Sequence, residues 1–186
     1  MQIKGDYLVN RLVYERFGSK NGLVRYVKYW LLSQVGAYRR FSAYRPGSDQ
    51  RVVFVCSGNI CRSPLAEVYA RSLGWEAKSC GLDCRDGFPA DPRAREFARG
   101  VGLDLEEHST VNVTSFEFQA SDLVVLMEPT HIAAFERKVG KGHTLALAGS
   151  YCRPPTPYIH DPFNCCIEFF HRCEHQIMEA VRRMCD

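Results

Sequence analysis

The sequence contains no long hydrophobic run and no secretory signal. The most apolar stretch of its N-terminal part, Trp30-Leu31-Leu32, is far shorter than the ~18 apolar residues that a membrane-spanning helix needs. Three charged residues, Lys4, Asp6 and Arg11, interrupt the place where the apolar core of a signal peptide would lie. These absences argue against a membrane span and a secreted protein, and they predict a cytoplasmic one.

The cysteines form no regular pattern. There are nine of them, an odd number, and their spacings do not repeat. In a reducing compartment such cysteines are free thiols, most of them buried and inert, so we expect no disulfide framework. The sequence also lacks the glycine-lysine pair of a Walker motif, which argues against nucleotide binding of that kind.

The chain has 186 residues, 46% of them hydrophobic and 24% charged, which is typical of one globular domain with an extension. Its net charge of +3 hides an asymmetry. Residues 1–50 hold nine basic and three acidic side chains, whereas residues 51–186 hold fifteen and eighteen. Because Pro46-Gly47 and the polar residues after it are typical of a linker, we expect a basic, aromatic-rich extension over 1–48 and a globular domain over 49–186.

The predicted domain alternates between two kinds of segment. Short apolar runs bounded by polar loops predict buried strands, and segments with apolar residues at helical spacing lie between them. The expected strands are 51–56, 76–80, 122–127 and 143–147, and the expected helices begin near 63, 91, 130 and 167. This alternation predicts an α/β fold, a parallel sheet with helices on both faces, in which ligands bind beyond the carboxyl ends of the strands.

The loop after the first strand carries the strongest chemical signal. Cys56 ends the strand, and the segment from Ser57 to Ser63 leads into a helix, so successive backbone N–H groups can converge above the helix N-terminus. Such a loop binds phosphate-like dianions. A thiol in that position, beside a guanidinium, has a pKa well below its usual value, so we expect Cys56 to be largely thiolate. Arg62 can hold two phosphate oxygens with its planar guanidinium.

A thiolate that attacks phosphorus needs a carboxyl group to protonate the leaving oxygen and later to activate water. Two Asp-Pro pairs compete for this role. Asp91-Pro92 opens a helical pattern, which makes Asp91 an N-cap. Asp161-Pro162 follows a stiff proline-rich stretch beyond the last strand, at the same sheet edge as Cys56. We therefore expect Asp161 to be the general acid, and the alternative is that it caps the final helix.

The segment 53–64, VFVCSGNICRSP, resembles the signature of the low-molecular-weight protein tyrosine phosphatases. The likeness spans essentially all of residues 51–186, and it continues through 79–81, 87–90, His108, 122–128 and Asp161-Pro162. The family implies a four-stranded parallel sheet with flanking helices. It also implies hydrolysis of phosphotyrosine through a cysteinyl-phosphate, a phosphotyrosine-containing protein as the partner, and no metal or other cofactor.

By the same resemblance, Cys56 is the nucleophile, Arg62 the phosphate clamp and Asp161 the general acid and then base. The polar network that would hold the loop in shape consists of Asn59, Ser63, Ser79 and His108, and the Ser63 hydroxyl would donate to the thiolate. The residues expected to bind the phosphate or the substrate ring are Ser57, Gly58, Asn59, Ile60, Cys61, Ser63 and Phe163.

The chain departs from the family pattern at several places. Phe163 and Asn164 stand where family members often carry tyrosines, although Phe163 can still stack on a substrate ring. No aromatic residue precedes Phe88 in the opposite wall, so the specificity for a ring is expected to be looser. The arginine often found after His108 is missing, and Glu128 stands where aspartate is usual.

The cysteines other than Cys56, and the histidines, allow more than one interpretation of their roles. Cys61 either packs beneath the loop or, as the family suggests, captures an oxidised Cys56 in a disulfide. A metal pair made of Cys56 and Cys61 would need further ligands. One helical stretch could hold a transition metal, although a buried helix with histidines at its edge is favoured there. Its candidate ligands are Cys165, Cys166, His171, Cys173 and His175.

Two rival functions also stay open. The first rival is an arsenate reductase of the same fold, which uses the loop cysteine and two relay cysteines. Cys80 and Cys84 could be that pair, but the relay cysteines of such reductases lie much farther along the chain. The second rival is a module that captures phosphotyrosine without turnover. The presence of Cys56, Arg62 and Asp161 together argues against it.

The first fifty residues lie outside the resemblance. An apolar stripe at helical spacing runs through Leu23, Val24, Val27, Trp30, Leu31, Val35 and Tyr38, with Arg25, Lys28, Arg39 and Arg40 around it. Such a basic helix could lie on an anionic membrane surface or dock on an acidic protein. The alternative is a helical hairpin that packs on its own domain or on another copy. Nucleic-acid binding is not expected, because no recognised motif supports it.

Overall fold

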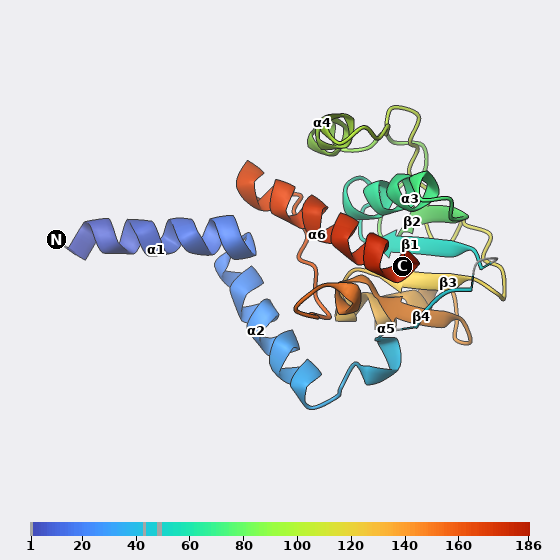
Figure 1. The fold of residues 1–186 in the computed structure, drawn as a ribbon, viewed down its shortest axis with the longest axis horizontal. Helices are drawn as coiled ribbons and strands as arrows, with labels where there is room; N and C mark the ends of the chain where they lie inside the picture. The colour runs from blue at the N-terminus through green and yellow to red at the C-terminus, as the bar shows by residue number, and fades with distance from the viewer. Residues whose placement is uncertain (1, 43, 48–49) are drawn as a thin grey trace.

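A parallel sheet of four strands forms the centre of the molecule (Figure 1). The computed structural model describes residues 2–42, 44–47 and 50–186, with the backbone alone over 2–9. The strands are β1 (Val52–Cys56), β2 (Ala77–Gly81), β3 (Leu123–Leu126) and β4 (Thr144–Leu147), in the order β2-β1-β3-β4. Val52 of β1 pairs with Ala77 on one side and with Leu123 on the other. The predicted α/β fold with a four-stranded parallel sheet is confirmed.

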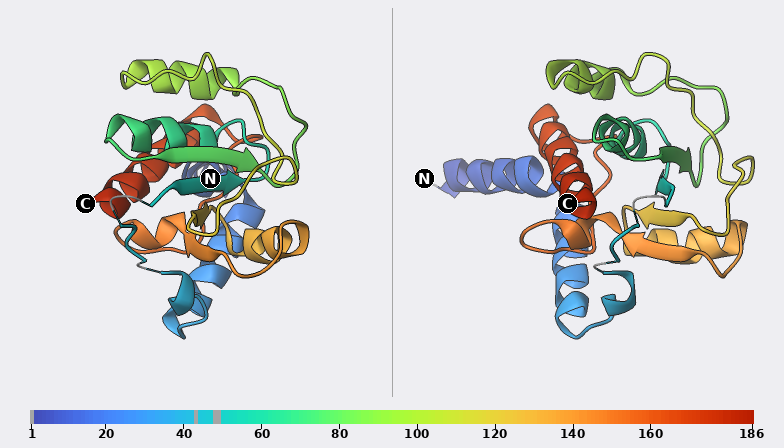
Figure 2. Two further views of the ribbon diagram at one scale, coloured as in Figure 1. Left: turned by 90° about the vertical axis from the view of Figure 1, so that its right-hand side faces the viewer. Right: turned by 45° about the vertical axis from the view of Figure 1, so that its right-hand side comes forward.

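Helices cover both faces of this sheet (Figure 2). One face packs against α3 (Arg62–Ser72) and α6 (Ile167–Cys185), and α4 (Pro92–Gly100) packs on α6. The other face packs against α5 (Pro129–Lys138). Because both faces are covered, β1 is a continuous apolar run, and all five of its residues are buried. As an inner strand, β1 has its carboxyl end between β2 and β3.

The predicted cap of α4 is present. Asp91 accepts a hydrogen bond from the backbone N–H of Arg93 at 2.8 Å, and Pro92 occupies the first turn. The Arg93 guanidinium pairs with the same carboxylate, at 3.0 Å between Nη2 and Oδ2. With these bonds the carboxylate of Asp91 caps the helix, as the sequence predicted.

Two helices form most of the extension, α1 (Gln2–Phe17) and α2 (Lys20–Gln34), and a short 3-10 helix, η1 (Arg39–Phe41), follows. The helices meet at Gly18 and diverge, so they do not lie antiparallel as a hairpin (Figures 1 and 2). Ser19 caps α2 by accepting a hydrogen bond from Gly22 N–H at 2.8 Å. Phe41 is buried in a hydrophobic cluster with residues of β1 and β3. The predicted helical extension is confirmed, while the boundary at 48–49 lies outside the described residues.

Most of the apolar stripe of α2 is exposed. The buried residues of α2 are Gly22 and Tyr29. Val24 is 66% exposed and Leu31 54%, and Val27, Trp30 and Val35 are exposed as well. Of the alternatives left open for the stripe, packing of these five side chains on their own domain does not occur, because the face with Gly22 and Tyr29 approaches the domain instead. Over the described residues, none of the helices has the length and apolarity that crossing a bilayer would take.

Candidate active site

The turn from β1 into α3 holds the candidate nucleophile. Cys56 is 2% exposed, and its Sγ accepts a hydrogen bond from the backbone N–H of Asn59 at 3.2 Å. The Oγ of Ser63 lies 3.0 Å from this sulfur. That Oγ accepts a hydrogen bond from Asn59 Nδ2 at 3.0 Å, and its own proton can go to the sulfur at 3.0 Å or to the more distant Cys80 backbone oxygen at 3.5 Å. The sulfur thus faces two donors at the N-terminal end of a helix.

Asn59 holds the loop in shape. Its φ of 52° lies in the left-handed region, which asparagine tolerates better than most residues. Its Nδ2 also donates to Ser79 Oγ at 2.9 Å, and its Oδ1 accepts from the backbone N–H of Val111 at 2.9 Å. His108 Nε2 donates to the Asn59 backbone oxygen at 2.7 Å. The structure therefore brings together Asn59, Ser63, Ser79 and His108, as the sequence predicted, and every polar end of the buried amide has a partner.

Arg62 is the largest fully buried side chain of the site. Its Nη1 donates to Glu128 Oε1 at 2.8 Å and to the backbone oxygen of Ile159 at 2.9 Å. Its Nη2 forms an ion pair with Asp161 Oδ2 at 2.9 Å. Burial alone would lower the pKa of Arg62, but the charges of Asp161, Cys56 and Glu128 raise it above its usual range. The guanidinium is thus a fixed cation next to the sulfur.

Asp161 lies in the irregular segment between β4 and α6, at the mouth of the site. Its side chain is 40% exposed, in contrast to the buried Arg62. Its Oδ1 also accepts a hydrogen bond from the backbone N–H of Phe163 at 3.2 Å. Asp161 therefore contacts both the buried guanidinium and the solvent. Asp91, the other candidate for the general acid, is paired with Arg93 instead.

A family model described as low molecular weight phosphotyrosine protein phosphatase matches residues 51–186. The chain belongs to this family. The matched segment includes the whole sheet and the loop just described. The extension formed by α1 and α2 lies outside it.

Curated relatives carry the same name. A low molecular weight protein-tyrosine-phosphatase of Streptomyces coelicolor is 32% identical over 154 residues, which cover 71% of this chain and 93% of that protein. The probable phosphatase EpsP of Ralstonia nicotianae is 37% identical over 79 residues, 41% of this chain. The chain spans about half the length of that relative, 54%.

Solved structures of the family have the same architecture. The tyrosine phosphatase AmsI of Erwinia amylovora superposes with a TM-score of 0.67 at 26% identity, over 77% of this chain and 95% of that one. Wzb of Vibrio vulnificus, in complex with benzylphosphonate, superposes with a TM-score of 0.65 at 30% identity, over 72% and 95%. The predicted family and its four-stranded fold are thereby confirmed.

His131 is a site residue that the sequence analysis missed. It lies in the first turn of α5, directly after β3, and its Nε2 is 3.2 Å from Ser57 Oγ. Burial and the charge of Arg62 lower the pKa of His131 to about 4, so the ring is neutral at pH 7. The signal that could have found it is topological, because β3 neighbours β1 and residues after β3 lie beside the phosphatase loop.

Two cavities flank the loop. One of about 470 Å³ is lined by Gly58, Ile60, Phe88, Asp91 and Phe163, among others. Phe88 and Phe163 are both about half exposed there, so two aromatic rings are available although the wall segment 82–86 before Phe88 holds none. The second cavity, of about 450 Å³, is lined by Ser57, Glu128, His131, Asp161 and, from the extension, Arg25. A family member without this extension has no counterpart of Arg25.

The other cysteines and histidines are arranged less favourably for chemistry. Cys61 is buried in the core as the cap residue of α3, and burial raises its pKa far above the usual value. His171 and His175 lie against Phe97, with ring centroids 5.6 Å and 4.9 Å away. In the described part of the chain, no three or more Cys, His, Asp or Glu side chains are grouped so that they could hold a metal ion. Cys80 is fully buried within β2.

Proposed function

We propose that the chain hydrolyses phosphotyrosine in proteins with Cys56 as the nucleophile, Arg62 as the phosphate clamp and Asp161 as the acid and base. The observation that carries these roles is the Arg62–Asp161 ion pair of 2.9 Å beside a sulfur that faces two hydrogen-bond donors. Substrate oxygens would bind to Arg62 and to the loop residues Ser57, Gly58, Asn59, Ile60, Cys61 and Ser63. Ser79 and His108 act indirectly, by holding Asn59.

The reaction has two displacements at phosphorus. In the first, Cys56 Sγ forms a bond to phosphorus, the bond from phosphorus to the tyrosyl oxygen breaks, and Asp161 gives its proton to that oxygen. In the second, water attacks the cysteinyl-phosphate and gives a proton to the Asp161 carboxylate. The S–P bond then breaks, which releases inorganic phosphate and restores the thiolate.

The aromatic cavity supports a preference for aryl phosphates. Phe88 and Phe163 can pack on both sides of a phenyl ring in this cavity. The side chain of phosphotyrosine is longer than that of phosphoserine, so its phosphate reaches further from the substrate backbone. The Wzb structure of Vibrio vulnificus holds benzylphosphonate, an aromatic phosphonate. The exposed Arg25 of α2 would contact substrate residues next to the phosphotyrosine, because it lines the cavity that contains Asp161.

Steady-state hydrolysis of p-nitrophenyl phosphate and of a phosphotyrosine peptide tests this proposal. We expect turnover by the native chain and none by Cys56→Ser, with Cys185→Ser, at the end of α6, as the matched control that retains activity. Acid quenching with labelled substrate should trap phosphate on native protein and not on Cys56→Ser. Binding without turnover would support the phosphotyrosine-binding module, and arsenate-dependent consumption of thiols would support the reductase.

We further propose that the protein works in the cytoplasm and associates with anionic membrane surfaces through α2. The exposed residues Val24, Val27 and Leu31 share one face of this helix with Lys20 and Lys28. A face with aliphatic side chains between lysines suits a layer of anionic lipid headgroups, because the lysines neutralise charge while the aliphatic groups enter the acyl boundary.

Vesicle co-sedimentation of the full chain tests the docking. We expect binding to vesicles of phosphatidylcholine with phosphatidylserine at low salt, weaker binding at high salt, and little binding to phosphatidylcholine alone. The double variant Val24→Ser with Leu31→Ser should bind several-fold less, whereas Val101→Ser, an exposed valine outside the extension, should bind like the parent. Equal sedimentation of the double variant and the parent would remove the proposal.

A further inference from the structure

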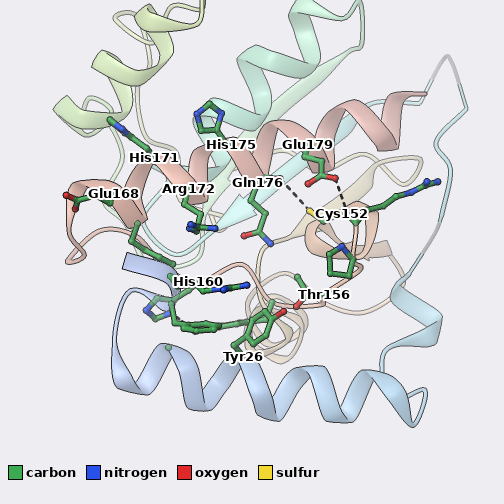
Figure 3. A pocket seen from close by; sticks show the side chains of 17 residues that line it. Tyr26, Cys152, Thr156, His160, Glu168, His171, Arg172, His175, Gln176 and Glu179 are labelled. Carbon is green, nitrogen blue, oxygen red and sulfur yellow. Dashed lines mark hydrogen bonds between the residues drawn. The ribbon is translucent and has the colours of Figure 1, made fainter. Parts of the chain in front are cut away.

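The junction of α1 and α2 packs against the back of the segment that carries Asp161. Figure 3 shows His160 at one end of a cavity between α2 and α6. This cavity has a volume of about 660 Å³, and Gly22, Tyr158, His160 and Phe169 are among the residues that line it. The extension therefore contacts the residue that directly precedes the proposed acid.

Two glycines allow this close approach. Gly18 has a φ of 76° and is buried, and a methyl group there would lie 2.7 Å from Cys165 Sγ and 2.8 Å from His160 Cδ2. A methyl group at Gly22 would lie 3.2 Å from two atoms of the His160 ring. The His160 ring thus packs directly against the backbone of the extension, because neither glycine has a side chain that would separate the two.

A series of aromatic contacts links α2 to the same place. The ring of Tyr29 packs on the ring of Tyr158, with centroids 5.2 Å apart. The Tyr158 hydroxyl is hydrogen-bonded to His160 Nδ1. On its other side, the His160 ring meets Phe169 of α6 at 5.7 Å. His160 is therefore enclosed by α2, Tyr158 and α6 together.

The segment around Asp161 depends on such anchors because residues 152–166 contain no helix or strand. On the side of the sheet, Ile159 N–H donates to the Met127 oxygen at 3.0 Å, and the Ile159 oxygen accepts from Arg62 at 2.9 Å. On the side of α6, the His160 oxygen accepts from Cys173 Sγ at 3.4 Å. The extension supplies the contacts on the remaining side.

We propose that the extension is a positioning element for the general acid. In this account Tyr29, Gly18 and Gly22 hold Tyr158 and His160, and these two positioning residues keep the Asp161 carboxyl at Arg62 and within reach of the leaving oxygen. The inference rests on the proposed role of Asp161. It gives the extension, which lies outside the family match, a direct influence on the rate of the first chemical step.

The leaving group provides the test. A phenol of ordinary acidity, such as the one released from phenyl phosphate, needs a proton as it departs, whereas p-nitrophenolate departs far more easily without one. Misplacing Asp161 should therefore slow phenyl phosphate hydrolysis and leave p-nitrophenyl phosphate hydrolysis nearly unchanged. A variant that merely loosens the fold would lower both rates together.

Three variants separate positioning from packing. We expect Tyr158→Phe and His160→Ala to lower kcat for phenyl phosphate about tenfold, a part of the ~10²–10⁴-fold that a general acid contributes, with less than about a twofold effect on p-nitrophenyl phosphate. His160→Asn can place an amide near the position of Nδ1 and should restore most of the loss. Val24→Ala, on the outward face of α2, is the matched control and should behave as the parent.

A double-variant comparison distinguishes this inference from the role on which it rests. If Asp161→Asn lowers kcat for phenyl phosphate much more than kcat for p-nitrophenyl phosphate, the role of Asp161 holds. Adding His160→Ala to that variant should then cause no further loss of kcat for phenyl phosphate. If Asp161→Asn is insensitive, the proposed role of Asp161 fails. If Asp161→Asn is sensitive and both Tyr158→Phe and His160→Ala leave the ratio of the two rates unchanged, the positioning inference alone is overturned.

Discussion

Asp161 and Arg62 form an ion pair across the boundary between solvent and core. Asp161 Oδ2 lies 2.9 Å from Arg62 Nη2, and the arginine is 1% exposed while the aspartate is 40% exposed. Glu128 already occupies the Nη1 side of the guanidinium. A phosphoryl dianion bound to Arg62 would therefore face Asp161, the side from which a leaving oxygen would receive its proton.

Replacing Asp161 by asparagine removes this proton donor while keeping the size of the side chain. We expect kcat for phenyl phosphate to fall by ~10²–10⁴-fold, because general acid catalysis contributes about that much for a poor leaving group. Binding of vanadate, which needs no proton from Asp161, should weaken less. Steady-state rates and vanadate titration measure the two effects, and equal rates for Asp161→Asn and parent would contradict the assignment.

Asn59 has two separable roles, its backbone conformation and its amide bonds. Asn59→Gly keeps the left-handed backbone and loses the amide, whereas Asn59→Ala loses both. We expect Asn59→Gly to lower the free energy of unfolding by about 1–3 kcal/mol, the usual cost of unpaired buried polar groups, and Asn59→Ala to lower it further. Urea unfolding measures both. Equal destabilisation would mean that the backbone conformation carries no cost.

His131 links stability to pH on the acid side. Its pKa is lowered to about 4 in the folded protein, chiefly by burial, while the unfolded chain binds the proton near pH 6.5. Between these values the unfolded state holds more protons, so stability falls as pH drops through this window. His131→Gln should flatten that fall, by an amount on the order of 3 kcal/mol over the window. Unfolding midpoints at pH 4.5 and 7 compare variant and parent.

Glu174 has the opposite effect. It is fully buried in α6, neither of its carboxyl oxygens has a hydrogen-bond partner among the described residues, and burial raises its pKa to about 8. The folded state therefore keeps a proton that the unfolded state releases above about pH 4.5, and stability is lost as pH rises toward 8. Glu174→Gln should be more stable than the parent at pH 8.5 by a few kcal/mol, and nearly equal to it at pH 5. A constant difference across pH would contradict this.

Arg25 should influence which phosphopeptides are accepted. Its exposed side chain lines the cavity that contains Asp161, so we expect acidic residues beside the phosphotyrosine to be favoured. Arg25→Glu should raise KM for such a peptide by about 3–10-fold at low salt, with a smaller change at high salt, because contacts between exposed charges are weak and screened. Lys28→Glu makes the same change of charge on the outward face of α2 and should leave KM unaltered.

The strands and helices of the domain followed from local patterns, and so did the phosphatase loop. The run from Arg51 to Cys56 and the Asp91 cap are determined by neighbouring residues, so the sequence predicted them close to their observed positions. Helix α3 was expected to begin near 63 and begins at Arg62, but Ser63 does not cap it, because its hydroxyl faces Cys56 Sγ. Asn59, Ser63, Ser79 and His108 were found through the family motif. Their mutual contacts span up to about fifty residues of sequence, which no local pattern reveals.

Two features could not be predicted from local patterns. His131 reaches Ser57 across 74 residues because β3 neighbours β1, and strand order is a property of the whole sheet. Which face of α2 packs on the domain stayed open in the sequence, because hydropathy patterns register large apolar side chains, whereas the contact is made by Gly22, where a side chain is missing, and by Tyr29. A contact made by the backbone of a helix cannot be recognised from the pattern of apolar side chains.

The two halves of the site differ in how firmly the chain holds them. β1 is hydrogen-bonded to a neighbour along each edge, so its amides can exchange with solvent hydrogen only when the domain as a whole opens. The stretch around Asp161 has no such ladder and can open by small local fluctuations. A local opening around Asp161 would therefore separate the carboxyl group from the sulfur while the sheet stays intact.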